Sequence, residues 1–147
     1  AEVYVAEIDP TLADTAQFCA AYGVPPEISA NCVVVAGRRA GEQRVAACMV
    51  LATTRADVNN VVKRHLDVRK ASFLPMEEAV VATGMEYGGI TPIGLPADWP
   101  VLVDAVVADL PYAVIGSGVR RSKLALPVTT LAVLPVAEIV DGVGRPA

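Results

Sequence analysis

The sequence predicts an α+β fold, a single domain spanning residues 1–147 in which a mixed, largely antiparallel sheet of six or seven short strands is combined with three or four helices. A chain of 147 residues fits one domain that buries roughly 70% of the surface of its unfolded state. Strand-like and helix-like segments follow one another in mixed order, without the strict alternation of a doubly wound parallel sheet. No repeat or linker divides the chain.

The first third of the chain predicts a strand, a helix and a hairpin. Residues 3–8 alternate in the manner of a half-buried strand, and residues 12–22 show a helical pattern that Gly23 ends in the C-cap role. Residues 31–37 and 44–52 are apolar, strand-like runs joined by a charged tip that contains two glycines. These two runs predict a hairpin in the core of the sheet.

The middle of the chain predicts two helices around a short strand. Thr54 precedes Asp57 by three residues, an acidic variant of the capping box, and the valines and leucine between 58 and 66 then fall on one helical face. Residues 68–73 predict a strand. Residues 75–83 open with a proline and two acids and end before a glycine, which is the polarity expected of a short helix.

The last third predicts three more strands and little else. The strands are expected at residues 99–104, 112–116 and 122–127, and residues 129–134 predict a final turn or two of helix. Residues 142–147, GVGRPA, are expected to be a frayed tail.

The composition argues against several classes of protein. Although 54% of the residues are hydrophobic, acids and Pro111 interrupt the most apolar run, residues 101–116, so nothing approaches the ~20 apolar residues that span a bilayer. The first residues lack the basic region of a signal peptide, and we expect a cytoplasmic protein without membrane partners. Cys19, Cys32 and Cys48 contain no C-x-x-C pair, so neither a disulfide framework nor a metal site is expected.

The basic residues are clustered although the formal net charge of the chain is -4. This net charge argues against indiscriminate binding to nucleic acids, including DNA, because such binding depends on many cations. Most of the lysines and arginines nevertheless fall in four groups, at residues 38–44, 63–64, 69–70 and 120–123. Two interpretations stay open: solvated hairpin tips and helix ends, or contacts with a few phosphates of a nucleic-acid end.

Residues 88–94, GGITPIG, contain three glycines and a proline but no acid, base or thiol. Glycine permits positive φ angles and close approach of the backbone, while Pro92 fixes its own φ and favours an extended conformation at Thr91. The segment can therefore present a stiff strip of backbone N–H groups. On the residues alone, the other interpretation is a tight connection between a helix and a strand.

Several segments of the chain follow one another in a recognisable order. The most specific are TGMEYGGITPIG (83–94), WPVLVD (99–104) and YAVIGSGVRRSKLAL (112–126). Upstream, residues 20–37 precede and enter the first core strand, and residues 44–73 supply a strand, a helix and another strand. Together these segments resemble the YbaK and prolyl-tRNA-synthetase editing-domain family over nearly the whole chain.

The resemblance implies an aminoacyl-tRNA hydrolase, a free-standing deacylase that removes a wrongly attached amino acid from tRNA. Members of this family use no metal, no cofactor and no covalent nucleophile. The implied partner is the 3′ acceptor end of aminoacyl-tRNA, and the oligomeric state stays open between a monomer and a weak dimer. Backbone N–H groups can stabilise the negative charge that develops on the ester carbonyl oxygen without help from a side chain.

The resemblance also implies a set of candidate site residues. The catalytic candidates are the glycine loop and the aspartate that ends the 99–104 strand: Gly88, Gly89, Thr91, Gly94 and Asp104. The aspartate either orients a group in the cleft or caps the following turn. The substrate-binding candidates are Asn31, Cys32, Pro92, Gly116, Gly118, Arg120 and Lys123.

Four positions depart from the family pattern. Asn31 and Cys32 stand where the family has a lysine, associated with the 3′-terminal nucleotide, followed by Thr or Ser. A charge-assisted hydrogen bond, roughly twice as strong as a neutral one, is therefore missing. Gly116 stands at a serine position, and Lys123 is either a replacement cation in the cleft or an exposed strand lysine. These departures support an alternative function, a catalytically degenerate module that binds a tRNA acceptor end, a nucleotide or a protein partner.

Overall fold

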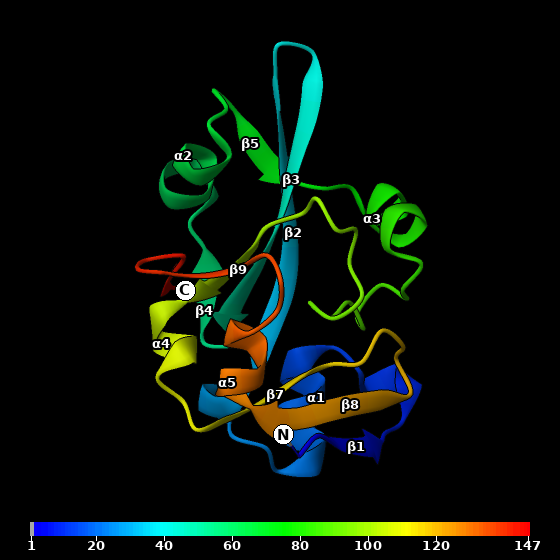
Figure 1. The fold of residues 1–147 in the computed structure, drawn as a ribbon. Coiled ribbons are helices and arrows are strands. Elements are labelled where there is room, and N and C mark those ends of the chain that lie inside the picture. The colour runs from blue at the N-terminus through cyan, green and yellow to red at the C-terminus, as the bar shows by residue number, and fades with distance from the viewer. Residues whose placement is uncertain (1) are drawn as a thin grey trace.

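The computed structural model describes residues 2–147 and has the α+β fold that the sequence predicts (Figure 1). In this part of the chain, ten strands form three sheets instead of one, and five α-helices lie around them. The alternating pattern locates the longer strands but not their partners, because the partners lie far apart in the sequence.

A five-stranded mixed sheet forms the centre of the molecule, in the order β5-β2-β3-β6-β9. Its strands are β2 (Ala30–Arg39), β3 (Glu42–Leu51), β5 (Ala71–Phe73), β6 (Val101–Asp104) and β9 (Ala137–Val140). β2 and β3 pair antiparallel, which confirms the predicted hairpin, and the tip turns through Ala40 and Gly41, both with positive φ. β6 runs parallel to β3 and to β9, so the sheet is mixed.

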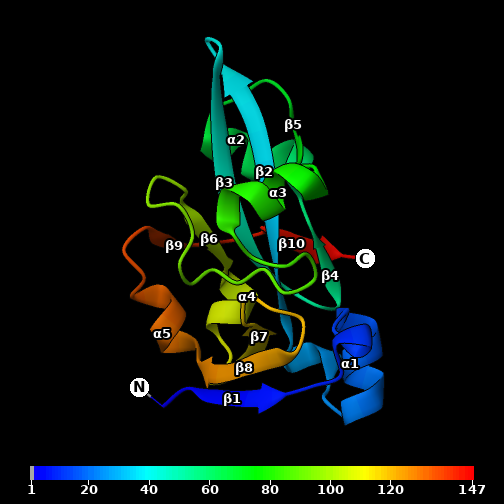
Figure 2. The same cartoon turned by 90° about the vertical axis from the view of Figure 1, so that its right-hand side faces the viewer.

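Two smaller sheets complete the fold. The three-stranded antiparallel sheet contains β1 (Tyr4–Glu7), β8 (Ser122–Pro127) and β7 (Tyr112–Gly116), and the two-stranded one contains β4 (Thr54–Ala56) and β10 (Gly144–Pro146). Figure 2 shows β1, β8 and β7 crossing the end of the molecule opposite the tip of the β2–β3 hairpin.

Residues 142–147 are not the frayed tail that the sequence suggests. β10 pairs with β4, and Val143 is fully buried. The backbone N–H of Gly144 donates a hydrogen bond to Asp104 Oδ2 at 3.1 Å. Residues 144–146 escape recognition in the sequence because a three-residue strand is too short to show an alternation of apolar and polar side chains.

The helices are short. They are α1 (Thr15–Tyr22), α2 (Lys63–Leu66), α3 (Met76–Thr83), α4 (Ala105–Ala108) and α5 (Val128–Ala132), with 3-10 turns at Pro10–Leu12 and Pro26–Ile28. Gly23 and Gly84 end α1 and α3 in the left-handed conformation, as predicted. The helix predicted from residue 58 begins as a π-helical turn, Val58–Val62, that continues into α2. α4 has only four residues, too few for a helical period to appear in the sequence.

Both faces of the central sheet are buried. Ala47 and Met49 of β3 pack towards β7, β8, α4 and α5, whereas Ala46, Cys48 and Val50 pack towards α2 and the C-terminal residues. Alternation along one strand therefore serves two cores and fixes the hairpin between them.

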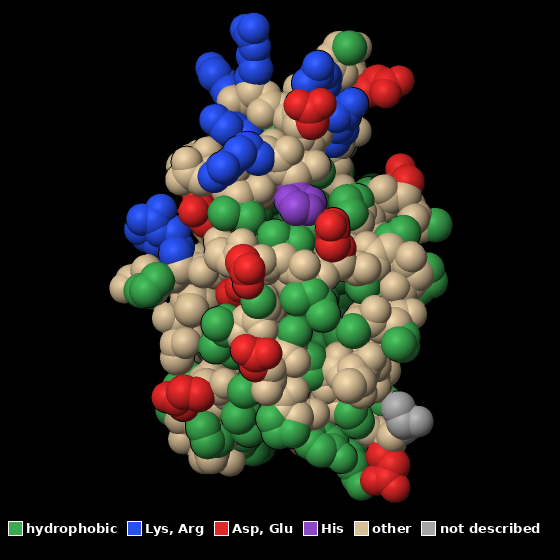
Figure 3. Space-filling model, turned by 60° about the vertical axis from the view of Figure 1, so that its left-hand side comes forward, with side chains coloured by type: hydrophobic (Ala, Val, Ile, Leu, Met, Phe, Trp, Pro, Cys, Tyr) green, Lys and Arg blue, Asp and Glu red, His purple; other side chains and the backbone are tan. Residues whose placement is uncertain are grey.

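The surface of the molecule is uneven in charge. Lysine and arginine side chains gather at the end that contains the hairpin tip, and acidic side chains lie mostly below it on the face shown in Figure 3. Among residues 2–147, no helix has both the length and the apolarity needed to cross a bilayer.

Candidate functional site

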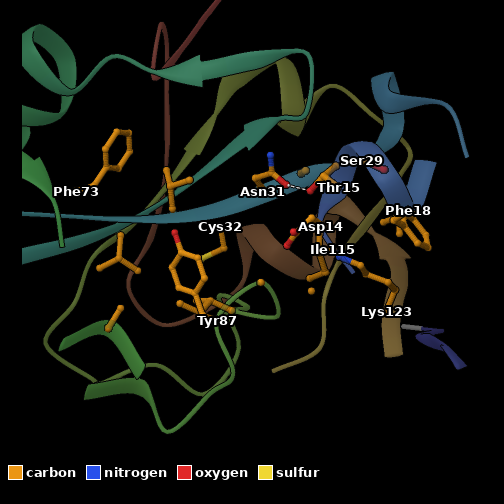
Figure 4. Close-up of a pocket in the computed structure, with 18 of the residues that line it drawn as sticks. Asp14, Thr15, Phe18, Ser29, Asn31, Cys32, Phe73, Tyr87, Ile115 and Lys123 are labelled. Atoms are coloured by element: carbon orange, nitrogen blue, oxygen red, sulfur yellow. Dashed lines mark hydrogen bonds between the residues drawn. The ribbon is translucent and has the colours of Figure 1, made fainter. Parts of the chain in front are cut away.

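A cavity of about 260 Å³ lies between β2, α1, the loop that follows α3, and the β7–β8 pair. Its lining extends from Phe73 at one end to Phe18 and Lys123 at the other, with Asn31 and Tyr87 between them (Figure 4). Four separate parts of the chain therefore meet around one partly open cavity.

The cavity brings together five of the residues expected from the sequence. These are Asn31, Cys32, Gly88, Gly116 and Lys123. The remaining candidates lie outside its lining: Gly89, Thr91, Pro92, Gly94, Asp104, Gly118 and Arg120. The glycine loop thus meets the cavity at its beginning, near Gly88 and Ile90, and not along its whole length.

Asn31 is held in place by a residue of α1. Its side-chain Oδ1 accepts a hydrogen bond from the Thr15 hydroxyl (Figure 4). With Oδ1 engaged, Nδ2 is the group left to donate, and no hydrogen bond within residues 2–147 occupies it. The cavity therefore has a neutral N–H donor at the position where the family pattern has a cation.

Lys123 lies in the cavity and is not an exposed strand lysine. Only 8% of its surface is exposed, and its Nζ lies 5.2 Å from the centroid of the Phe18 ring. A cation over an aromatic face is attracted by the ring quadrupole. Burial nevertheless lowers the pKa of the Lys123 ammonium; Arg120 lowers this pKa further, whereas Cys19 and Asp14 raise it.

Among the described residues that line the cavity, no hydrogen bond joins a side-chain nucleophile to a base. Burial raises the pKa of the Cys32 thiol, and the neighbouring Cys48 raises this pKa further. Burial also raises the pKa of the Cys48 thiol, to about 12. The thiolate is the nucleophilic form of cysteine, so neither thiol is activated near neutral pH. The single histidine, His65, is outside the lining and pairs with Glu138 at 3.0 Å.

Arg120 joins the glycine loop to the segment that precedes α1. Its Nε donates to Pro10 O at 3.0 Å, and its Nη1 donates to Asp14 Oδ1 at 3.1 Å and to Tyr87 O at 3.2 Å. Its backbone N–H donates to Glu86 Oε1 at 2.9 Å. These contacts give Arg120 a structural role, since its donors hold the walls of the cavity together.

The glycines allow two backbone segments to lie in contact. A Cβ added at Gly89 would lie 2.7 Å from backbone atoms of Val119, and one added at Gly116 would lie 2.6 Å from the carbonyl oxygen of Ile90. The Gly118 N–H donates to Gly89 O at 2.6 Å. Gly89 and Gly116 therefore serve the packing of chain on chain, which is a different use from the close approach to a ligand that the sequence suggests, whereas Gly118 is favoured by its positive φ of 98°.

Two residues of the loop that line the cavity have backbone N–H groups without a hydrogen-bond partner among the described residues. The Gly89 N–H donates to the carbonyl oxygen three residues earlier at 2.9 Å, and the Thr91 N–H donates to Met85 Sδ at 3.5 Å, so this conformation does not support either as a donor to a ligand. Gly88 and Ile90 line the cavity, and no hydrogen bond within residues 2–147 occupies their N–H groups. These two amides are the candidate electrostatic groups of the site.

Asp104 stabilises the C-terminal strand. It is 1% exposed and accepts the hydrogen bond from the Gly144 N–H described above. Burial raises the pKa of its carboxyl, and nearby backbone N–H groups, those of residues 144, 105 and 106, oppose this. Neither of the two roles open in the sequence is seen: Asp104 lies outside the cavity lining, and although it is the N-cap residue of α4, its side chain makes no capping hydrogen bond.

Sequence reasoning missed several residues that α1, β5 and the loops contribute to the lining. They are Asp14, Thr15, Phe18, Ser29, Phe73 and Tyr87. Only Tyr87 had a signal, its position next to Gly88 in the glycine loop. The face of α1 that lines the cavity depends on where α1 packs, which periodicity does not reveal. Within residues 2–147, no three His, Cys, Asp or Glu side chains gather in a way that could hold a metal ion.

Comparisons with known proteins show to which family the chain belongs. The model of the aminoacyl-tRNA editing domain family matches residues 9–134. Among solved structures, a hypothetical protein designated APE2540 superposes with a TM-score of 0.84 at 21% identity, over 98% of this chain and 92% of its own. A candidate trans-editing enzyme for prolyl tRNA synthetase superposes with a TM-score of 0.81 at 19% identity, over 99% of this chain and 87% of its own.

At these identities the two structures are evidence for the fold alone, and a comparison with curated proteins found no match. The family model, in contrast, spans most of the chain and confirms the resemblance seen in the sequence. The protein belongs to the aminoacyl-tRNA editing domain family.

Proposed function

We propose that residues 1–147 are one editing domain that acts as a free-standing deacylase and hydrolyses the ester between a wrongly attached amino acid and the 3′ end of tRNA. The observation that carries the proposal is the pair of unoccupied N–H groups, at Gly88 and Ile90, beside a cavity without an activated side-chain nucleophile. Membership of the editing-domain family supports the same substrate.

The proposed reaction needs no side-chain nucleophile. A water molecule, or a hydroxyl of the substrate, adds to the ester carbonyl carbon, and the carbonyl oxygen becomes an oxyanion. Collapse of this intermediate breaks the bond to the ribose oxygen, which takes a proton and leaves with the tRNA. Two fixed N–H donors stabilise the oxyanion, and the loss of one such donor typically lowers a rate by about 10² to 10³.

The size of the cavity supports a compact substrate group. Its volume of about 260 Å³ is below the roughly 300–1,000 Å³ of pockets that enclose a whole drug-sized ligand. In the proposed complex the ester and the amino acid lie inside the cavity, with Nδ2 of Asn31 as a neutral donor, and most of the nucleic acid lies outside it.

A deacylation screen over tRNAs carrying different wrong amino acids tests the proposal. At least one ester should be cleaved well above its spontaneous rate. Replacing Cys32 by leucine fills the cavity and should lower this rate at least tenfold, whereas Cys48→Ala removes a buried thiol outside the cavity and should leave the rate per folded molecule unchanged. If no ester is cleaved faster than in buffer, the chain is not a deacylase.

Asn31 favours a second candidate function, a binding module that has lost hydrolysis. This side chain is neutral, and its Oδ1 is engaged by Thr15. The variant Asn31→Lys separates the two functions. If the parent is inactive and the variant hydrolyses an ester, the chain is a degenerate relative that binds without cleaving. If the parent is active and the variant is slower, the asparagine belongs to a specialised enzyme.

A further inference from the structure

A second concave surface lies next to the cavity, and we call it the basic groove. It has a volume of about 1090 Å³ and lies between β2, β3, α2, β5 and the start of α3. Four cations line it, Arg38, Lys63, Arg69 and Lys70, with Glu78 as the one carboxylate in the lining. They come from three of the basic groups seen in the sequence, which the fold brings to one end of the molecule.

The cations of the basic groove are free of ion pairs. Among residues 2–147, Arg39 and Arg44 both form salt bridges with Asp67, but no salt bridge involves the four cations of the groove. Arg38, Arg69 and Lys70 are exposed. In a chain of net charge -4, this end is therefore a local site of positive potential that attracts an anionic partner.

The basic groove adjoins the cavity. Phe73 and Leu74 line both of them. Phe73 is 55% exposed and lies at the end of the cavity away from Lys123 (Figure 4). An exposed aromatic ring beside unpaired cations is the combination on which nucleic-acid bases stack while their phosphates are neutralised.

We propose that the basic groove binds the sugar-phosphate backbone of the RNA strand whose aminoacylated 3′ end enters the cavity past Phe73. The inference rests on the proposed function, in which the ester and its amino acid occupy the cavity. Beyond the proposed function, the inference specifies that the rest of the RNA lies along β5 and α2 and towards the hairpin tip, and that the cations of the basic groove hold it.

Binding of uncharged RNA tests the groove without requiring hydrolysis. The probe is a labelled RNA hairpin that ends in single-stranded CCA, and its affinity for the full chain is measured by fluorescence anisotropy at several salt concentrations. The groove variant is Arg38→Gln/Arg69→Gln. The matched control is Arg55→Gln/Arg145→Gln, which removes the same charge from exposed residues that face each other across β4 and β10.

At about 0.1 M salt, the groove variant should bind the hairpin roughly tenfold more weakly than the parent. The slope of log affinity against log salt concentration should be shallower by about one to two, because two phosphate contacts are lost. The control should bind within about twofold of the parent. No binding by the parent, no loss in the groove variant, or an equal loss in the control would each overturn the inference.

Hydrolysis of two substrates separates this inference from the proposed function. With an ester found in the deacylation screen, the groove variant should lose activity on the aminoacylated hairpin but keep it on an aminoacylated CCA trinucleotide. Equal loss on both substrates would contradict the groove. If neither the parent nor the groove variant hydrolyses either substrate, the proposed function fails. The anisotropy measurement still decides whether the groove binds RNA.

Discussion

Thr91 and Lys123 are buried polar residues with different surroundings. Thr91 is 3% exposed, and within residues 2–147 its hydroxyl has no hydrogen-bond partner. Lys123 is 8% exposed and lies over the Phe18 ring. An unpartnered buried hydroxyl costs roughly 1–3 kcal/mol, and a buried charge costs more unless it is compensated. Only Lys123 lies in the cavity, where a substrate could compensate for that cost.

Replacing Thr91 by valine should stabilise the protein without changing its activity. The substitution removes a hydroxyl that has no partner and nearly conserves the side-chain volume. We expect the free energy of unfolding, measured with urea, to rise by about 1 kcal/mol. The deacylation rate should be unchanged; a fall of tenfold or more would return Thr91 to the catalytic set.

Replacing Lys123 by methionine should stabilise the protein at neutral pH. Because its pKa is lowered from the ordinary value of 10.5, the folded protein holds this proton less tightly than the unfolded chain does. The resulting penalty is fully present below the folded pKa and disappears as the pH rises through it towards 10.5. Thermal unfolding should therefore show a higher Tm for Lys123→Met near pH 7 and a shrinking difference above it. A lower Tm near pH 7 would mean that the contact with Phe18 outweighs desolvation.

The sequence predicts which residue types belong to the site better than it predicts which way their side chains point. Asn31, Gly88 and Lys123 are expected at the site and line the cavity. Thr91 and Asp104 are expected there too, but they point into packed interior, because their orientation depends on the pairing of the segments around them. A strand residue has two faces available, and its sequence does not say which of them a helix will cover.

Among the elements, the C-terminal strand β10 differs most from the prediction, because the sequence suggests a frayed tail at residues 142–147. Val143 belongs to the core that contains α2 and one face of β3. Replacing Val143 by alanine should lower the free energy of unfolding by about 2 kcal/mol, because it leaves a cavity in packed interior. Arg145→Ala, at an exposed position of β10, should change it by less than about 0.5 kcal/mol. Equal, negligible effects in urea unfolding would mean that these residues are frayed after all.

The predictability of an element follows its length and the locality of its contacts. The β2–β3 hairpin is predicted well, since its strands are long, apolar and joined by a short turn. The caps of α1 and α3 are predicted because a single glycine marks each of them. β4 and β10 have three residues each and pair across most of the chain, so no local pattern reveals them. The split into three sheets is missed for the same reason.

In the whole molecule, the fold brings basic residues from separate sequence clusters together in one groove. Of the two interpretations left open for the basic groups, solvated ends and phosphate contacts, the convergence of Arg38, Lys63, Arg69 and Lys70 on one groove favours the second. Net charge could not reveal this, because it contains no information on position. The cavity likewise exists only once residues 14–34, 73–90 and 114–123 meet.

The proposed hydrolysis depends on backbone N–H groups that stabilise the oxyanion without help from a side chain, and the most direct measurement alters one of these N–H groups alone. Replacing Gly88 by glycolic acid turns its N–H into an ester oxygen and adds no side-chain atom. With an ester found in the screen, the single-turnover deacylation rate should fall by about 10² to 10³. The same replacement at Gly89, whose N–H donates to the carbonyl oxygen of Glu86, removes a hydrogen bond within the loop and not a donor to the ester, so it should lower the rate far less. An unchanged rate with glycolic acid at position 88 would contradict the account.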